Sequence, residues 1–325
     1  MLLICKIHAE VILRLAFTQI LLLIVALIVI VLISPHALAT STASEATKRT
    51  LLVNGVSREY LVYYPSERNL KRPVVFAFHG GFGSAESIMK KSKLHETRRG
   101  RDYIIVYPTG YRRSWNVGPC CGYAKKDNID DLAFFDAMLL DIQKIANVDT
   151  SRVYVTGFSN GAMMTYHLAC NRADKIAAIA PVGGAMQGDL EACRPSRAIP
   201  IMHIHGASDE WAPFLGGEGK RKQAGKQRPI PELIAFWYKK YSCAEEQAFS
   251  FAKDVNCTSF SQCAAGGSVT LCLVDGLGHQ WPGHKPRYLM LKMLGAGKPE
   301  VKGSEEILKF FDRWSLDKII EKEGK

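Results

Sequence analysis

The stretch VYVTGFSNGAMM, residues 153–164, decides the fold of this chain. Its first half is apolar and β-branched, which predicts a buried strand, and its second half begins a run typical of a helix. Ser159 falls at the junction, between Gly157 and Gly161. A sharp turn from strand to helix strains the residue at its tip and leaves no space for neighbouring side chains. The stretch therefore predicts a nucleophile elbow that presents Ser159 to a ligand.

Strand and helix patterns alternate on both sides of this stretch. Asn54 and Gly55 separate two strand-like runs, 51–53 and 60–64, and predict a two-residue hairpin. The alternation predicts an α/β fold, with a mostly parallel, doubly wound sheet and helices on both faces. The further strands expected are 74–78, 103–107, 176–182 and 199–204, with helices between them, and 269–274; helices are expected at 130–145, 231–241 and 304–314.

Two of the predicted strands end in residues that complete a catalytic set. Asp209 follows the strand at 199–204, and His279 follows the strand at 269–274. Carboxyl ends of parallel strands gather at one edge of such a sheet. A serine hydroxyl needs a base within hydrogen-bond reach and an acid behind that base. We therefore expect Ser159 as nucleophile, His279 as base and Asp209 as acid.

Other residues of the same types compete for two of these roles. Asp130 and Asp131 are alternative acids, but their position favours capping the helix that begins there. His79 fits better as a strand-end residue that supports the glycine-rich loop beside it. The remaining competitors for the base are His203, His205 and His284.

Two sets of residues are candidates for holding a substrate. The backbone amides of Gly81 and Asn160 are the expected oxyanion hole. Trp281, Trp211 and Trp115 are core aromatics by default, and they are also candidates for lining the substrate pocket. Residues 216–229 are expected to form a loop near the site. We expect no cofactor and no metal, because no Cys-x-x-Cys pair with matching histidines occurs.

The first 39 residues read as a secretory signal. Lys6, His8 and Arg14 precede the apolar run 20–33, and small residues follow at 37–39. The alternative is an uncleaved anchor, although the run of fourteen apolar residues is shorter than the roughly 20 that a spanning helix needs. The predicted protein is thus secreted or periplasmic, and it meets a membrane only if this segment is retained. A polar linker at 40–50, a catalytic domain at 51–315 and a charged tail at 316–325 complete the domain prediction.

Cysteine usage agrees with export. Eight cysteines follow the signal, and an even set in an oxidising compartment predicts disulfides rather than a metal site. We expect Cys170 to pair with Cys193, and the adjacent Cys120 and Cys121 to take separate partners. The sequence leaves the other pairings open among Cys120, Cys121, Cys170, Cys193, Cys243, Cys257, Cys263 and Cys272.

The chain is basic, with a formal net charge of +11 among 325 residues, of which 47% are hydrophobic and 22% charged. The basic residues are scattered or gathered in loops such as 220–228, without interleaved aromatic side chains. This distribution favours a solvated basic surface and argues against nucleic-acid binding.

Several stretches together resemble the secreted polyhydroxybutyrate-depolymerase-like and feruloyl-esterase-like α/β-hydrolases. They include HGGFGS from His79, SWNVGPCCGYA from Ser114, GFSNGAMM from Gly157, HIHGASDEWAPFLGG from His203 and GLGHQWPG from Gly276. The resemblance covers about residues 51–315 and implies a serine esterase with the nucleophile, acid and base argued above. It implies hydroxyalkanoate oligomers or feruloyl-type esters as substrates. The segment between Pro282 and Ser304 follows no such pattern, which leaves the substrate open.

Two other functions are compatible with the sequence. An envelope acyltransferase would use the same acyl-enzyme and pass the acyl group to a hydroxyl other than water. A non-catalytic ligand-binding protein of the envelope is the alternative from a different class, with the basic loop at 220–228 as its contact surface. The intact serine, acid and histidine set argues against the second.

Overall fold

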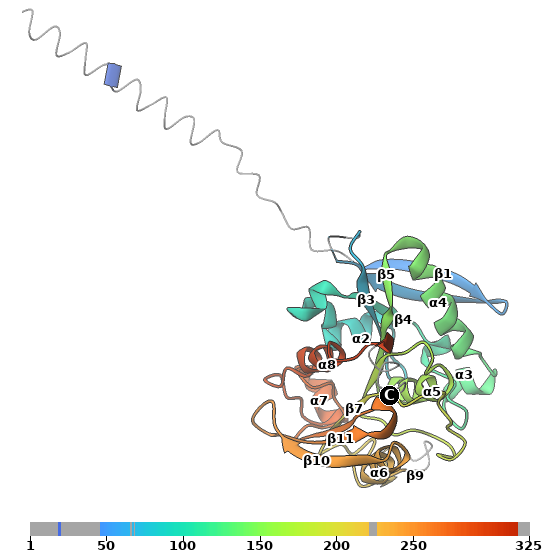
Figure 1. Cartoon of the computed structure of the whole chain (residues 1–325), viewed down its shortest axis with the longest axis vertical. Helices are drawn as coiled ribbons and strands as arrows, with labels where there is room; N and C mark the ends of the chain where they lie inside the picture. The colour runs from blue at the N-terminus through green and yellow to red at the C-terminus, as the bar shows by residue number, and fades with distance from the viewer. Residues whose placement is uncertain (1–18, 21–45, 66, 68, 221–225, 318–325) are drawn as a thin grey trace, which may run out of the picture. The chain divides into compact units, whose positions relative to one another are not determined.

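The computed structural model describes residues 19–20, 46–65, 67, 69–220 and 226–317 (Figure 1). The chain divides into two units, Met1–Ala43 and Ser44–Lys325, and the second contains all the strands and helices that follow. Apart from residues 19–20, the predicted signal lies outside the described residues, as does most of the predicted charged tail. Within the described part of the chain, no helix is both long enough and apolar enough to cross a bilayer.

Among the described residues, ten strands form one sheet in the order β1-β2-β4-β3-β5-β6-β7-β12-β11-β10. The run from β4 to β12 is parallel, whereas the two strands at each edge are antiparallel. The strands are β1 (Thr47–Val53), β2 (Val56–Tyr63), β3 (Arg72–Phe78), β4 (Ile104–Pro108), β5 (Val148–Phe158), β6 (Ala178–Val182), β7 (Ile201–Gly206), β10 (Cys243–Phe249), β11 (Val255–Cys263) and β12 (Val269–Val274). The predicted fold class is confirmed.

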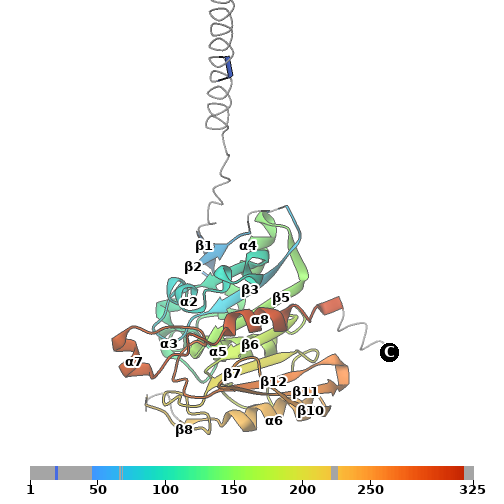
Figure 2. The same cartoon turned by 90° about the vertical axis from the view of Figure 1, so that its left-hand side faces the viewer.

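Helices cover both faces of this sheet because side chains alternate along the buried strands. On β3, Phe76 and Phe78 point into the core cluster that includes residues of α4, α5 and α6, whereas Val75 and Ala77 point into the cluster with α2 and α8. Figure 2 shows α8 in front of the strands. The helices are α2 (Ala85–Ser92), α3 (Gly122–Lys126), α4 (Asp131–Ile145), α5 (Asn160–Asn171), α6 (Ile230–Lys240), α7 (Tyr288–Leu294) and α8 (Gly303–Phe311).

The opening hairpin forms where Asn54 and Gly55 predict it, with φ angles of 49° and 77°. Strand β1 nevertheless begins at Thr47, inside the stretch expected to be a linker. Residues 47–50 are polar, so they carry no apolar strand signal, but they pair in register with β2. Arg49 also forms an ion pair with Asp141 of α4, with 2.6 Å between Nε and Oδ2.

The structure differs from the sequence-based prediction on both sides of β7. Residues 183–200, between β6 and β7, contain no helix. Beyond α6, β10 and β11 extend the sheet. Their side chains are mostly polar or part-exposed, which hides the strand pattern in the sequence. A disulfide between Cys243 and Cys263 joins β10 to β11, and one between Cys257 and Cys272 joins β11 to β12.

The predicted disulfide between Cys170 and Cys193 is confirmed. It joins α5 to the irregular connection that follows β6, 23 residues further along the chain. This cross-link attaches α5, the helix that follows the elbow, to the connection between β6 and β7. A disulfide thus holds a connection that lacks a helix of its own.

Candidate active site

Ser159 lies at the turn between β5 and α5, with φ 56° and ψ −117°. Non-glycine residues rarely adopt such a conformation, and it costs on the order of 1–3 kcal/mol. A Cβ atom at Gly157 would collide with the carbonyl oxygen of Gly161, and one at Gly161 with that of Phe78. Only glycines at 157 and 161 allow this close contact between β5, α5 and β3. The tight turn that results places Ser159 just beyond the end of β5.

The structure brings the three predicted residues into one hydrogen-bonded chain. The Oγ atom of Ser159 lies 2.9 Å from Nε2 of His279, and Nδ1 of His279 lies 2.7 Å from Oδ2 of Asp209. Because a carboxylate only accepts, Nδ1 donates to it, and Nε2 is left to accept from the serine hydroxyl. Both Asp209 and His279 are buried, with 4% and 6% of their surfaces exposed.

The second oxygen of Asp209 is tied to its own loop. Oδ1 accepts the backbone N–H groups of Trp211 at 2.9 Å and Ala212 at 2.8 Å. Burial opposes the negative charge, but the neighbouring His279, their hydrogen bond and the Ala212 amide together hold the pKa of Asp209 below its usual range. The acid is therefore ionised and fixed in orientation.

His203 and His205 stand behind the acid rather than beside the serine. Tyr166 donates to Nδ1 of His203 at 2.8 Å, and Nε2 of His203 lies 3.0 Å from Nδ1 of His205. Nε2 of His205 donates in turn to the carbonyl of Ala212 at 2.7 Å. Burial lowers the pKa of both histidines, so they remain neutral. They support the loop that carries Asp209.

His79 braces the glycine-rich loop after β3. Its Nε2 accepts the N–H of Gly110 at 2.8 Å, which leaves Nδ1 to donate to the carbonyl of Gly80 at 2.7 Å. Burial lowers the pKa of His79 to about 4, so the ring is neutral at physiological pH. Neither ring nitrogen is directed to Ser159.

The predicted oxyanion donors, Gly81 and Asn160, line the same cavity as the serine. In the loop after β3, Phe82 donates to the carbonyl of Arg113 and Gly83 to that of Gly80, and the Gly81 amide takes part in neither bond. Asn160 is the first residue of α5, where a backbone N–H has no partner within the helix. Gly81, Asn160 and Ser159 line the same cavity.

The three candidate pocket tryptophans separate. Trp211 lines the cavity, and its ring stacks near that of His279 with centroids 6.3 Å apart. Trp115 and Trp281 are fully buried and line no part of the cavity, so the prediction for these two is wrong. The Trp115 indole donates to the carbonyl of His79, and the Trp281 indole donates to Ser304. Both rings face the interior of the protein. Their positions in the sequence, close to other motifs, do not show in which direction the rings point.

The two rejected acids have structural roles, and one of them was missed as a support of the site. Asp130 caps α4 by accepting the N–H of Ala133 at 2.8 Å. Asp131 is buried, and its carboxylate accepts from Arg58 at 2.6 Å and from the backbone N–H of Asn116 at 2.7 Å. Asp131 thus holds Asn116, and the preceding residue, Trp115, contacts the elbow. There, the Asn160 side chain accepts the N–H of Trp115 at 2.9 Å.

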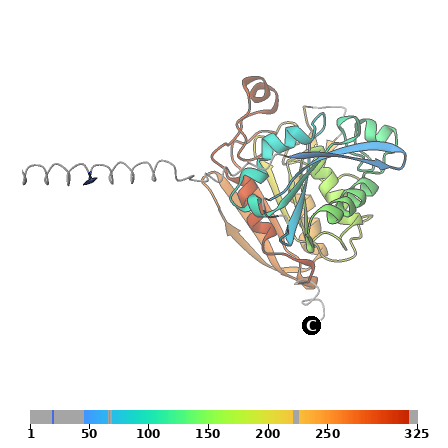
Figure 3. The ribbon, with the colours of Figure 1, turned by 90° about the horizontal axis from the view of Figure 1, so that it is seen from above.

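A cavity of about 840 Å³ opens above Ser159. The predicted loop 216–229 contributes Gln227, at the end of the short pair β8 (Gly217–Glu218) and β9 (Lys226–Gln227). The unmatched segment before Ser304 forms α7, which lies at the margin of the unit in Figures 2 and 3. Three of its residues line the cavity, namely Met290, Met293 and Leu294.

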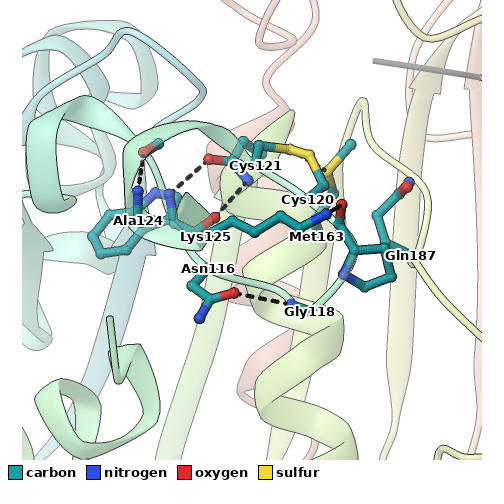
Figure 4. The surroundings of a disulfide bond; sticks show 12 residues. Asn116, Gly118, Cys120, Cys121, Ala124, Lys125, Met163 and Gln187 are labelled. Carbon is teal, nitrogen blue, oxygen red and sulfur yellow. Dashed lines mark hydrogen bonds between the residues drawn. A yellow bond between two sulfur atoms is a disulfide. The ribbon is translucent and has the colours of Figure 1, made fainter. Parts of the chain in front are cut away.

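Adjacent Cys120 and Cys121 form a disulfide with each other, contrary to the expected separate partners (Figure 4). The other six cysteines after the signal pair among themselves, so these two sulfurs have no alternative partner. The bridged pair lines the cavity, and Cys121 Sγ lies 4.0 Å from Sδ of Met163. Lys125 supports the turn by donating to the carbonyl of Pro119 at 2.6 Å.

Comparisons with known proteins identify relatives of this chain. Residues 131–226 match the family model described as phospholipase/carboxylesterase. The chain is 30% identical over 267 residues to the putative esterase NocK of Nocardia uniformis subsp. tsuyamanensis, a match covering 77% of this chain and 76% of that protein. Feruloyl esterase B of Piromyces equi is 30% identical over 236 residues, covering 68% of this chain but only 42% of its own length.

A solved structure titled as a thermostable esterase supports the same fold. It superposes with a TM-score of 0.56 at 16% identity, covering 83% of this chain and 63% of that one. At this identity the likeness concerns the fold alone. Taken with the relatives above, the chain belongs to the esterase family of α/β-hydrolases, and the protein is a carboxylic ester hydrolase.

Proposed function

We propose that the protein is a secreted serine esterase that hydrolyses carboxylic esters through an acyl-enzyme on Ser159. One observation carries this proposal: a chain of hydrogen bonds runs from Asp209 through His279 to Ser159, and Ser159 lines the cavity. A serine in such a chain can lose its proton as it attacks, which an isolated hydroxyl does not do at neutral pH.

In the first half-reaction, Ser159 Oγ attacks the acyl carbonyl while its proton passes to Nε2 of His279. The negative oxygen of the tetrahedral intermediate would be held by the amides of Gly81 and Asn160, at the positive end of α5. His279 then gives its proton to the ester oxygen of the leaving alcohol. The carbon–oxygen bond breaks, and the acyl group stays on Ser159.

In the second half-reaction, water replaces the alcohol. His279 takes a proton from the water as it attacks the acyl carbon, and later returns a proton to Ser159. Asp209 holds the imidazole in the tautomer that both steps need, and its negative charge stabilises the imidazolium. The two amides supplied by the Trp211–Ala212 turn keep that carboxylate in place.

The cavity and the relatives support two substrate classes. Its lining is predominantly apolar, and its volume of about 840 Å³ accommodates an aromatic or short aliphatic acyl group. A relative named feruloyl esterase supports aromatic acyl esters, whereas hydroxyalkanoate oligomers are supported by the sequence resemblance. The signal-like residues 1–39 and the disulfides support secretion.

Hydrolysis by the purified protein of p-nitrophenyl acetate, p-nitrophenyl butyrate, methyl ferulate and a 3-hydroxybutyrate trimer tests this function. We expect cleavage of at least one ester, with loss of turnover in Ser159→Ala. Preference for ferulate or for the trimer selects the substrate class. Cleavage of none of the four, or retained turnover in Ser159→Ala, would contradict the proposed function.

A further inference from the structure

Among the described residues that line the cavity, the charged side chains apart from the titratable His279 all carry positive charge. These residues include no aspartate or glutamate, but they include four basic residues, Lys91, Arg112, Arg113 and Lys126. Elsewhere in the described chain, many basic residues have acidic partners, for example Arg58 with Asp131. The cavity thus presents an unbalanced positive charge to whatever enters it.

Lys91 is the most enclosed of these four. It lies in the last turn of α2 and is half-buried, whereas the other three are exposed at the mouth of the cavity. Its ammonium nitrogen lies 5.0 Å from the ring centroid of Phe158. Among the described residues, no carboxylate lies within ion-pair distance of Lys91, although Lys93, two residues further along, binds Glu96 at 2.8 Å. Burial lowers the pKa of Lys91, and no acidic group in the described part of the chain offsets this effect.

The contacts of Lys91 indicate that it faces the alcohol half of the ester rather than the acyl half. The Phe158 ring that faces Lys91 also packs against the His279 ring, with centroids 4.8 Å apart. His279 must deliver its proton to the leaving oxygen, so the alcohol half of the substrate departs on the side of His279. Lys91 and His279 both contact the Phe158 ring, and all three side chains line the cavity, so the part of the cavity that would receive the departing alcohol also contains this cation.

We propose that Lys91 binds a negative charge on the alcohol half of the substrate, and that the enzyme prefers acyl esters of hydroxycarboxylic acids whose own carboxyl group is free. Arg112, Arg113 and Lys126 at the mouth attract the same anion into the cavity. A partly desolvated cation gains more from such a partner than an exposed one does. This preference rests on the proposed function, since it presupposes ester hydrolysis at Ser159.

A pair of substrates that differ in charge and little else tests this preference. The pair is 3-(butanoyloxy)butanoate and its neutral amide, 3-(butanoyloxy)butanamide, with kcat/KM measured from the release of butanoate at pH 7.5 and low ionic strength. We expect the wild-type protein to favour the anionic substrate by about tenfold, mainly through KM, and this ratio to fall as salt is added.

Variants of α2 assign the effect to Lys91. In Lys91→Met the ratio should fall to about one, whereas Lys91→Arg, which retains the charge, should keep most of it. Lys90→Met is the matched control, because Lys90 is the exposed neighbour on the same helix and does not line the cavity. Its ratio should equal that of the wild type.

The outcomes separate the two levels of the proposal. If the wild-type protein cleaves both substrates with a ratio near one, or with a ratio that salt does not change, anion recognition is wrong and ester hydrolysis stands. If Lys91→Met slows both substrates equally, Lys91 has a structural role only. Cleavage of neither substrate, nor of the four esters above, would instead contradict the esterase function. If Lys91→Met does not fold, the salt dependence of the wild type still decides whether the enzyme recognises the anion.

Discussion

The floor of the cavity and its walls are built differently. The floor contains Ser159 and His279, and Asp209 lies behind them; these residues follow the ends of β5, β12 and β7 and are fixed by hydrogen bonds. The walls come from connections and short helices, and two of their residues, Phe82 and Tyr123, leave half or more of their surface exposed. From this contrast we propose that the reaction takes place at the floor and that the walls select the ester.

The largest effect is expected from a change in the floor. Asp209→Asn should lower kcat by about 10⁴, because an amide can hold His279 in the wrong tautomer. Folding should change little, which denaturant unfolding will check. Asp130→Asn is the matched control, since it alters only a helix cap, so its kcat should stay near that of the wild type. A comparable loss in Asp130→Asn would reassign the acid.

The disulfides distinguish support of the floor from shape of the wall. Replacing Cys170 and Cys193 by serine should lower the free energy of unfolding by about 3 kcal/mol, because their bridge closes a loop of 23 residues. Replacing Cys120 and Cys121 by serine should cost far less stability, since this bridge joins neighbours and restrains little of the unfolded chain. The double replacement of Cys120 and Cys121 should instead change the relative kcat/KM of acetate and butyrate esters, because this bridge lines the cavity. Equal destabilisation by the two double variants would remove the distinction.

Acid should weaken the support behind the oxyanion loop. The folded-state pKa of His79 is about 4, below the ordinary histidine value of 6.5. The unfolded chain therefore binds this proton first, and stability is lost as pH falls from 6.5 towards 4, by up to about 3 kcal/mol. Denaturant unfolding at pH 7 and pH 4.5 measures this loss, to which His203 and His205 contribute in the same direction. In His79→Asn the difference between the two pH values should be smaller, and an unchanged difference would exclude His79 as a source.

The smallest effects are expected on α7. Met290→Ala should change the preference between acetate and butyrate esters by a few fold, because the side chain lines the cavity. Leu291→Ala, which removes an exposed side chain outside the lining, should leave that preference unchanged. The unfolding midpoints of both variants should stay close to that of the wild type. A large loss of stability in Met290→Ala would show that α7 belongs to the core.

The same contrast separates what the sequence predicts from what it does not. The meeting of Ser159, Asp209 and His279 could be predicted because each follows an apolar strand, and parallel strands bring their carboxyl ends together. Strands β10 and β11 could not be predicted, because their side chains are mostly polar or part-exposed and carry little apolar periodicity. The burial of Trp115 and Trp281 and the bridge between Cys120 and Cys121 depend on contacts between distant segments. Segment 283–303 lacked any pattern from which α7 or its place in the wall could be inferred.

Covalent labelling of the nucleophile tests the central assignment most directly. The purified protein is treated with diethyl p-nitrophenyl phosphate, an organophosphate that reacts with activated serines, and its peptides are analysed by mass spectrometry. One diethylphosphoryl group should appear on the peptide that contains Ser159, with loss of esterase activity in proportion to labelling and no label in Ser159→Ala. Label on a different residue, or full activity in a protein completely labelled at Ser159, would contradict the role of Ser159 as the nucleophile.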